Sequence, residues 1–235
     1  SDLLDDVTTV SAYPLVAIEE TVAAQRKVGL GVMGFAELLV QLGIRYDSDA
    51  ALSVADRLMA HVDHEATRAS HALAEERGPF PRWDESKYAA PTAHADWFRR
   101  HTGEDPDDWA DGYPIRNHGV TSVAPTGTTS LIAGTSAGIE PLYDVVYART
   151  ADHDVQGDEP MVTFDAYFLD VLAARGIDAA HVREAAREQL QAGTYDGPAS
   201  LPIPDDLVDL FVTARDVPPA AHVRMQAAFQ RHVDG

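Results

Sequence analysis

Two short β-like runs in this chain each end in a glycine- or proline-containing turn that leads directly into a helix-like segment. Residues 28–32 form the first apolar run, and an apolar pattern at helical spacing follows from Phe35 to Leu42. Residues 119–124 form the second run, which Pro125-Thr126-Gly127 interrupts before the apolar segment 128–133. Because strands that alternate with helices are typical of α/β folds, we predict an α/β fold.

The remaining pattern predicts mostly helices, with one further strand. The longest predicted helix runs from Asp49 to Arg77, where Gly78-Pro79 ends it. A strand is expected over 139–147, although Pro141 interrupts its start. Flexible joints are expected at 157–160 and 193–202. The other predicted helices cover residues 11–25, 92–101, 164–175, 178–191, 204–214 and 218–233.

The charge of the chain excludes several classes of partner. The formal net charge is −20, and Lys27 and Lys87 are the only lysines. Nucleic acid and anionic membranes both require a basic face, so neither is an expected partner. No run reaches the roughly 20 apolar residues of a membrane span, and no secretion leader is evident, so we expect a cytoplasmic protein. Such acidity is best tolerated where salt screens it, which favours a halophilic source.

The sequence contains no cysteine. Disulfides, thiolate nucleophiles, cysteine-ligated zinc and iron–sulfur clusters are therefore excluded within these residues. His61 and Glu65 have the i, i+4 spacing of a metal-binding pair, but a solvated helix face explains them better. We therefore predict no metal site.

The string Gly29-Leu30-Gly31-Val32-Met33-Gly34 matches the G-x-G-x-x-G pattern of dinucleotide-binding proteins. In such proteins an acidic residue about 20 positions later binds the ribose from the end of a second strand. Asp49 and Asp56 lie near that distance, but no apolar strand presents either of them. Tight packing between a strand and its helix is the favoured interpretation of Gly29, Gly31 and Gly34.

The segment 134–138 matches the G-x-S-x-G pattern of serine hydrolases. That pattern requires a strand before Ser136 and a helix after it. Here the predicted order is reversed, because a short helix precedes Ser136 and a strand follows it. Hydrolase activity is therefore disfavoured.

The strongest candidate site is the turn that follows the second β-like run. Pro125, Thr126 and Gly127 are followed at once by Thr128, Thr129 and Ser130, where a helix begins. Unpaired backbone N–H groups and hydroxyls at a helix start favour phosphate without any lysine. Simple N-capping by Thr126 or Thr128 is the alternative explanation.

Ten sequence blocks cover nearly the whole chain: 26–35, 42–44, 46–48, 74–78, 80–81, 116–117, 124–128, 138–141, His222 and 225–230. These blocks resemble, in the same order, those of ribonucleotide reductase large chains. The resemblance is greatest to the adenosylcobalamin-dependent class II enzymes of haloarchaea.

This resemblance implies that residues 1–235 form the second half of a ten-stranded α/β barrel with additional helices, incomplete at both ends. It implies that Pro125, Thr126, Gly127, Thr128 and Thr129 hold the phosphates of a ribonucleotide that is reduced to a deoxyribonucleotide for DNA synthesis. Adenosylcobalamin is the implied cofactor. The radical-bearing and reducing cysteines are expected elsewhere in the reductase, so we predict no catalytic residue here and no activity for the chain alone.

The expected partners are the ribonucleotide, the rest of the reductase chain and, in a homodimer, a second copy. Two alternatives stay open: an NAD(P)-binding oxidoreductase that uses Gly29 to Gly34, and a non-catalytic assembly module that pairs with the missing half. Neither the choice between di- and triphosphate nor that between radical sources is decided by the residues.

Overall fold

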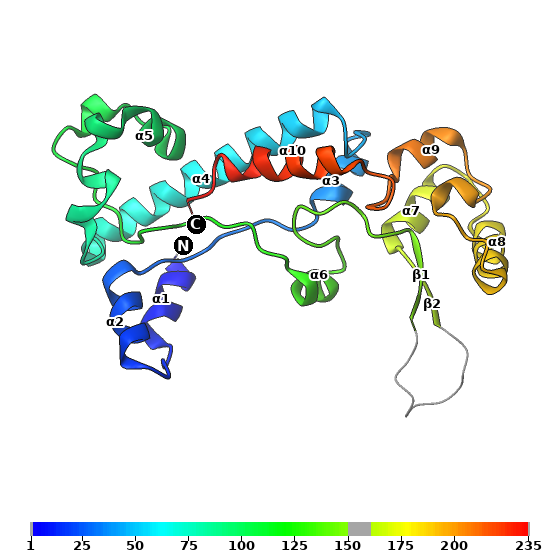
Figure 1. The fold of residues 1–235 in the computed structure, drawn as a ribbon, viewed down its shortest axis with the longest axis horizontal. Helices are drawn as coiled ribbons and strands as arrows, with labels where there is room; N and C mark the ends of the chain where they lie inside the picture. The colour runs from blue at the N-terminus through cyan, green and yellow to red at the C-terminus, as the bar shows by residue number, and fades with distance from the viewer. Residues whose placement is uncertain (1, 150–160, 235) are drawn as a thin grey trace. The chain divides into compact units, whose positions relative to one another are not determined.

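The structure, a computed structural model, describes residues 2–149 and 161–234, and helices dominate it (Figure 1). The predicted joint at 157–160 lies outside the described residues. The α-helices are α1 Asp2–Val10, α2 Val16–Gln25, α3 Phe35–Gln41, α4 Asp49–Arg77, α5 Ala95–Thr102, α6 Gly127–Ala133, α7 Ala166–Ala174, α8 Ala179–Ala192, α9 Asp205–Leu210 and α10 Pro219–Gln230. The strands are β1 Val146–Arg149 and β2 Met161–Phe164, and short 3₁₀ turns are η1 Trp83–Glu85, η2 Lys87–Ala89, η3 Pro91–His94, η4 Pro106–Trp109 and η5 Pro198–Ser200.

Each predicted helix has a counterpart and one helix is added, although the helix predicted over 204–214 is observed as α9, which ends at Leu210. Helix α4 begins at Asp49 and ends at Arg77, as predicted from its apolar face and from Gly78-Pro79. The first residues, 2–10, form α1, which was not predicted. The helix predicted from residue 164 begins later, because Phe164 is the last residue of strand β2. Asp165 is the N-cap of α7, and its side chain accepts a hydrogen bond from Phe168 N–H.

The chain forms two compact units. Unit 1 contains residues 1–32, 52–124 and 225–235, and unit 2 contains residues 33–51 and 125–224.

The two predicted β-like runs pair in parallel within unit 1. Val28 N–H donates to Gly119 O at 2.9 Å, Leu30 N–H to Val120 O at 2.8 Å, and Ser122 N–H to Leu30 O at 2.9 Å. These bonds form one isolated parallel β-bridge, between Leu30 and Thr121. These two runs therefore lie beside each other, as the barrel expectation requires.

The third predicted strand, 139–147, is wrong over most of its length. Regular strand structure begins only at Val146, where β1 pairs antiparallel with β2 from Val146–Phe164 to Arg149–Met161. Before it, Leu142 makes one parallel bridge to Thr213. Pro141 has no N–H to donate, so it interrupts the ladder at that point.

An aromatic cluster forms the core of unit 1. Phe98 and Ile115 have no exposed surface, and Phe98 and Tyr113 meet edge to face with ring centroids 5.5 Å apart. Partly buried tryptophans surround this core. The cluster consists of Ala66, Phe80, Tyr88, Phe98, Tyr113, Ile115 and Val120. Ala66 belongs to α4, Phe98 to α5 and Val120 to the second β-like run, so the core packs this run against the long helix.

The helices of unit 2 also pack around aromatic rings. Phe168 of α7 and Phe211, just after α9, are fully buried and meet edge to face at 5.1 Å. Leu172, Val182 and Leu207 are buried as well. Unit 2 therefore has an apolar core of its own.

Asp5 organises a polar cluster in unit 1. Its carboxylate is 1% exposed and accepts hydrogen bonds from Arg26 Nε at 2.8 Å, Arg116 Nε at 3.2 Å, Arg77 at 3.2 Å and Asn117 Nδ2 at 3.0 Å. Burial alone raises the pKa of Asp5, but the hydrogen bonds and charges of Arg26 and Arg116 outweigh it and lower the pKa. The cluster joins α1 to α4 and to the start of both β-like runs.

None of the described helices combines the length and the apolar character needed to cross a lipid bilayer.

Replacing Asp5 with alanine is expected to destabilise the protein by about 3–5 kcal/mol, because buried arginine charges lose their counter-ion. Replacing it with asparagine should flatten the acid limb of the stability profile. The lowered pKa means that Asp5 contributes stability above its usual value of 3.8 and loses it as the pH falls through the folded value. Urea unfolding between pH 2 and 7 measures both effects.

Asp6→Asn is the matched control, because Asp6 is 57% exposed and contacts Arg77 alone among these arginines. Equal effects of the substitutions at Asp5 and Asp6 would contradict the assignment.

Candidate functional site

The glycines of the first β-like run are explained by steric contact with its neighbouring strand. A Cβ atom on Gly29 would lie 2.6 Å from Ser122 Oγ, and one on Gly31 would lie 2.7 Å from the Ser122 carbonyl oxygen. Gly34 adopts φ +79°, and a Cβ there would lie 2.6 Å from Thr135 Oγ1. These three glycines allow the chain to pack closely, so the structure gives no support to the alternative of an NAD(P) site.

Thr126, in the predicted phosphate loop, has a backbone conformation that is rare for a β-branched residue. Its φ is +51° and its ψ is +24°, in the left-handed region. Its hydroxyl oxygen accepts a hydrogen bond from Gly138 N–H at 2.7 Å, and its carbonyl oxygen accepts one from Ser130 N–H at 2.8 Å. Strain of about 1–3 kcal/mol is typical of such a residue and marks a loop that its surroundings hold in place.

The first turn of α6 keeps its free backbone donors. The side chain of Thr126 makes no capping bond to the helix, which contradicts the capping explanation for this residue. Gly127, Thr128 and Thr129 are exposed, and the first N–H groups of an α-helix have no partner within the helix. The predicted loop residues therefore present amides and two hydroxyls to solvent.

The segment 134–138 lies against the start of α3. Gly34 N–H donates to Ser136 O at 2.9 Å, and Thr135 Oγ1 donates to Glu37 at 2.8 Å. Burial raises the pKa of Glu37. The Ser136 hydroxyl is buried without a hydrogen-bond partner, α6 precedes it and β1 follows it. This arrangement offers no base to activate Ser136, so it does not support a serine hydrolase.

A cavity of about 380 Å³ opens beside the loop, within unit 2. Gly127, Ser130 and Thr135 line it, together with Glu140, Asp144 and Asp165. Its described lining contains no lysine or arginine. Tyr195 donates a hydrogen bond to Asp144 at 2.5 Å, and burial raises the pKa of Asp165. The carboxylates disfavour a phosphate inside this cavity, so the exposed start of α6 is the better place for one.

A buried polar network in unit 1 was not predicted from the sequence. His101 Nδ1 lies 2.6 Å from Asp63 Oδ2, and the Thr121 hydroxyl lies 3.1 Å from Asp63 Oδ1 and 3.2 Å from Asp234 Oδ1. Asp234 also accepts from the backbone N–H groups of Val120 and Thr121, all at 3.0 Å. Burial raises the pKa of Asp63, although the bond to His101 opposes it. The network fixes the end of the chain against the second β-like run.

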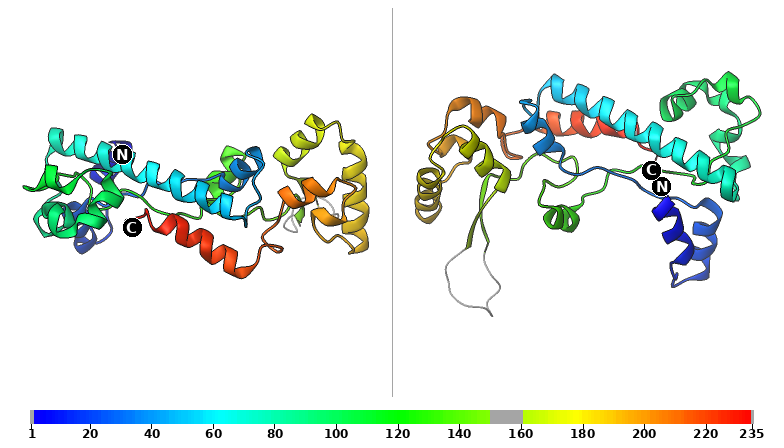
Figure 2. Two further views of the ribbon diagram at one scale, coloured as in Figure 1. Left: turned by 90° about the horizontal axis from the view of Figure 1, so that it is seen from above. Right: turned by 180° about the vertical axis from the view of Figure 1, so that it is seen from behind.

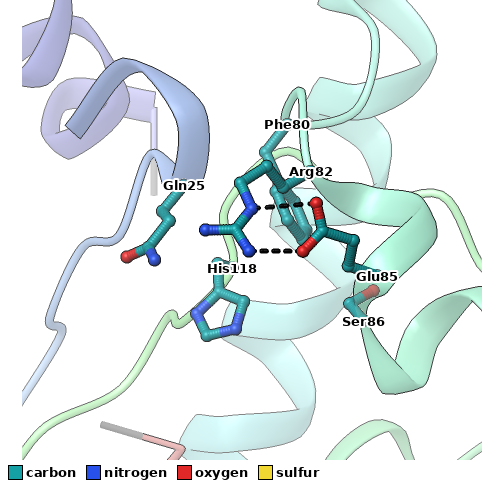
Figure 3. Close-up of a pocket in the computed structure, with 6 residues that line it drawn as sticks. All are labelled: Gln25, Phe80, Arg82, Glu85, Ser86 and His118. Carbon is teal, nitrogen blue, oxygen red and sulfur yellow. Dashed lines mark hydrogen bonds and ion pairs between the residues drawn. The ribbon is translucent and has the colours of Figure 1, made fainter. Parts of the chain in front are cut away.

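A small hollow in unit 1, about 100 Å³ in volume, is shown in Figure 3. Arg82 and Glu85 form an ion pair at its wall, and burial, assisted by Lys27, lowers the pKa of His118 beside them. Small-molecule sites typically occupy about 300–1,000 Å³, so this hollow is too small for a nucleotide. Among the other histidines, His64 and His71 each bond to a backbone carbonyl oxygen, at 2.8 and 2.6 Å.

Residues 1–235 match the family model described as the ribonucleotide reductase barrel domain. The chain belongs to this family. It is 42% identical over 231 residues to a vitamin B12-dependent ribonucleoside-diphosphate reductase of Mycobacterium tuberculosis, covering 98% of this chain and 29% of the relative. It is 35% identical to the enzyme of the same name from Thermoplasma acidophilum, again over 98% of this chain but 26% of the relative. The chain therefore spans less than a third of the length of these curated relatives.

A solved structure agrees with this assignment at the level of the fold. The alpha subunit of a class Id ribonucleotide reductase from Actinobacillus ureae matches with a TM-score of 0.68 and 18% identity, over 98% of this chain and 37% of that one. The expectation of a reductase-type barrel fold is therefore confirmed. The resemblance to haloarchaeal enzymes in particular stays a prediction.

The sequence predicted the position of the loop but not the contacts that hold it in place. Thr126 is fixed by Gly138, and Gly127 lines the cavity. Pro125, Thr128 and Thr129 are exposed beside them. The network around Asp63 was missed because its bonded members lie 38 to 114 positions apart. The assignment of the five loop residues, 125–129, as phosphate ligands stays a prediction.

Thr126→Val is expected to lower the free energy of unfolding by about 1–3 kcal/mol, because it leaves the Gly138 N–H without its acceptor. Thr126→Ser keeps the hydroxyl oxygen and should stay closer to the wild type. Urea unfolding of both variants measures the difference. Equal stability of the two would show that the bond to Gly138 does not hold the loop.

Proposed function

We propose that residues 1–235 form part of the catalytic barrel of an adenosylcobalamin-dependent ribonucleoside-diphosphate reductase. The whole protein would convert ribonucleotides to deoxyribonucleotides for DNA synthesis. Support comes from the barrel-domain family match and from two relatives that are named vitamin B12-dependent ribonucleoside-diphosphate reductases. The residues that carry the radical and the electrons lie, in this proposal, in the remainder of the polypeptide.

The part assigned to this chain is to bind the substrate phosphates through Pro125, Thr126, Gly127, Thr128 and Thr129. This assignment is supported by the conformation of the loop. Thr126 has a left-handed backbone conformation that its bond to Gly138 stabilises, and the exposed first turn of α6 that follows has no side-chain cap. Amides and hydroxyls there can donate to phosphate oxygens without a cationic side chain. Such a site suits a chain with a net charge of −20.

The cofactor is assigned to the rest of the polypeptide. Two cavities of this chain have volumes of about 400 and 380 Å³, and carboxylates contribute to the walls of both. That volume is near the lower limit for drug-sized ligands, and a corrin is much larger. Neither cavity therefore fits adenosylcobalamin.

The acidity of the chain bears on the kind of organism that it comes from. We propose a cytoplasmic protein of a halophile, because the net charge is −20 and Lys27 and Lys87 are the only lysines. Self-repulsion of this size is weakened when the screening length falls from about 10 Å at 0.1 M salt to about 3 Å at 1 M.

The proposed site is tested on the complete reductase polypeptide, supplied with adenosylcobalamin and a dithiol reductant. Replacing Thr128 and Thr129 together with valine should raise KM for a ribonucleoside diphosphate by about 10- to 100-fold, because hydrogen bonds to a charged group contribute about 1.5–3 kcal/mol. The value of kcat should change less. Residues 1–235 alone should form no deoxyribonucleotide.

Thr21→Val is the matched control for this experiment, because the Thr21 hydroxyl is exposed and bonds to the Ala17 carbonyl of its own helix. The phosphate assignment is wrong if the loop variant and the control have the same KM. Turnover by residues 1–235 without added polypeptide would contradict the proposal that the radical-bearing and reducing residues lie outside this segment.

The salt proposal predicts that the free energy of unfolding rises as KCl increases from 0.1 to about 2 M. Asp107→Asn with Asp108→Asn should weaken this dependence, because both residues are exposed in the acidic turn η4. Thermal unfolding at a series of KCl concentrations measures it. A stability that is constant or falls with salt would argue against a halophilic protein.

A further inference from the structure

The segment 134–138, which matched the serine-hydrolase pattern, is hydrogen-bonded to the start of α3. Gly34 N–H donates to Ser136 O at 2.9 Å, and Phe35 N–H donates to Gly138 O at 3.4 Å. The first N–H groups of a helix have no partner within it, so these two carbonyl oxygens satisfy donors at the start of α3. Helix α3, in blue, and the segment that follows α6, in green, both belong to unit 2 (Figures 1 and 2).

The side chain of Glu37 adds a third link between α3 and this segment. Its carboxylate accepts a hydrogen bond from Thr135 Oγ1 at 2.8 Å. Burial, more than the charge of Asp165, raises the pKa of Glu37. The bonds from the Thr135 hydroxyl and from the Ser136 backbone lower this pKa and so act in the opposite sense. Two donors of one segment therefore converge on a carboxylate that burial alone would disfavour.

The same segment is bonded to both ends of helix α6. After the helix, Thr135 N–H donates to Ser130 O at 3.0 Å. Before it, the Thr126 hydroxyl oxygen accepts a hydrogen bond from Gly138 N–H at 2.7 Å. Thr135 takes part in both sets of bonds, because its N–H reaches α6 and its hydroxyl reaches α3. The position of α6 relative to α3 therefore depends on the segment 134–138.

Tyr46 fixes the chain one residue beyond this segment. Its hydroxyl donates to Ile139 O at 2.7 Å, and its ring meets Phe35 edge to face with centroids 6.4 Å apart. Tyr46 is 5% exposed and Phe35 is 1% exposed, so replacing either would disturb the core of unit 2. Glu37 is only partly buried, so its side chain can be changed with less damage to folding.

We infer that Glu37 is a positioning residue for the phosphate loop 125–129 and that it acts through Thr135. This inference rests on the proposed function, in which the loop binds the phosphates of a ribonucleotide. Hydrogen bonds weaken steeply as their angles depart from linearity, so a small rotation of α6 would weaken the bonds to phosphate. Glu37 opposes such a rotation because it fixes the segment that is bonded to both ends of the helix. A carboxylate repels phosphate, so Glu37 orients the loop and does not bind the ligand.

Calorimetry of pyrophosphate binding to the complete reductase polypeptide tests this role. Glu37→Ala removes the acceptor of the Thr135 hydroxyl and should raise Kd for pyrophosphate about 10-fold, equivalent to about 1.4 kcal/mol. Glu37→Gln keeps an oxygen acceptor at the same place and should restore an affinity near that of the wild type. Glu188→Ala is the matched control, because Glu188 is exposed on α8 of the same unit. Equal affinities of the two alanine variants would overturn the inference.

A double-variant cycle separates positioning from a general loss of stability. Thr135→Val removes the hydroxyl but keeps the N–H that bonds to α6. If Glu37 acts through Thr135, the variant with both substitutions should bind pyrophosphate no more weakly than either single variant. Additive losses would contradict the inference. Circular dichroism shows whether each variant is folded. If Glu37→Ala does not fold, Thr135→Val decides alone, and an unchanged affinity for pyrophosphate overturns the inference.

The inference and the proposed function fail in different ways. If replacing Thr128 and Thr129 with valine weakens pyrophosphate binding but Glu37→Ala does not, the positioning role is wrong and the phosphate assignment stands. If the wild type binds no pyrophosphate, or if neither change weakens binding, the phosphate assignment is wrong and the positioning role falls with it. If both changes weaken binding but the complete polypeptide forms no deoxyribonucleotide, the proposed reaction is wrong and the positioning role stands.

Discussion

Much of unit 1 depends on the hydrogen bonds and ion pairs around Asp5. Three arginines and Asn117 converge on this one carboxylate, and Asn117 also bonds to Arg26 O and to Ser70 of α4. The first helix, the long helix and the segments that lead into both β-like runs therefore share one charged centre. A buried charge is tolerated only when it is paired and fully hydrogen-bonded, so these elements must come together as a set. The loop that begins at Pro125 continues from a strand fixed in this way.

The sequence predicted α4, whose signals are local, and missed α1, whose one buried residue is polar. Helix α4 follows from its apolar pattern and its Gly78-Pro79 end. Helix α1 was missed because its buried residue is Asp5, and its partners lie 21 to 112 positions away. No periodicity in the local sequence can indicate an aspartate that is buried by distant arginines.

The same reasoning separates the predicted and unpredicted parts of the candidate site. Pro125, Thr126 and Gly127 could be located because a turn signal and a run of hydroxyl residues are local features. The bond from Gly138 to Thr126 crosses 12 positions and depends on tertiary structure. The glycine string was harder still, because Gly29 and Gly31 satisfy a nucleotide-binding pattern while their actual constraint is the proximity of Ser122.

The hydrogen bond between Gly138 and Thr126 also restricts rotation of the threonine side chain. The hydroxyl oxygen already accepts the Gly138 N–H, so its own hydrogen is left to donate in the remaining directions. A freely rotating hydroxyl loses conformational entropy each time it orients toward a ligand. In Thr126 the position of this oxygen is set on folding, so only the rotation of its own hydrogen remains to be ordered when the hydroxyl donates.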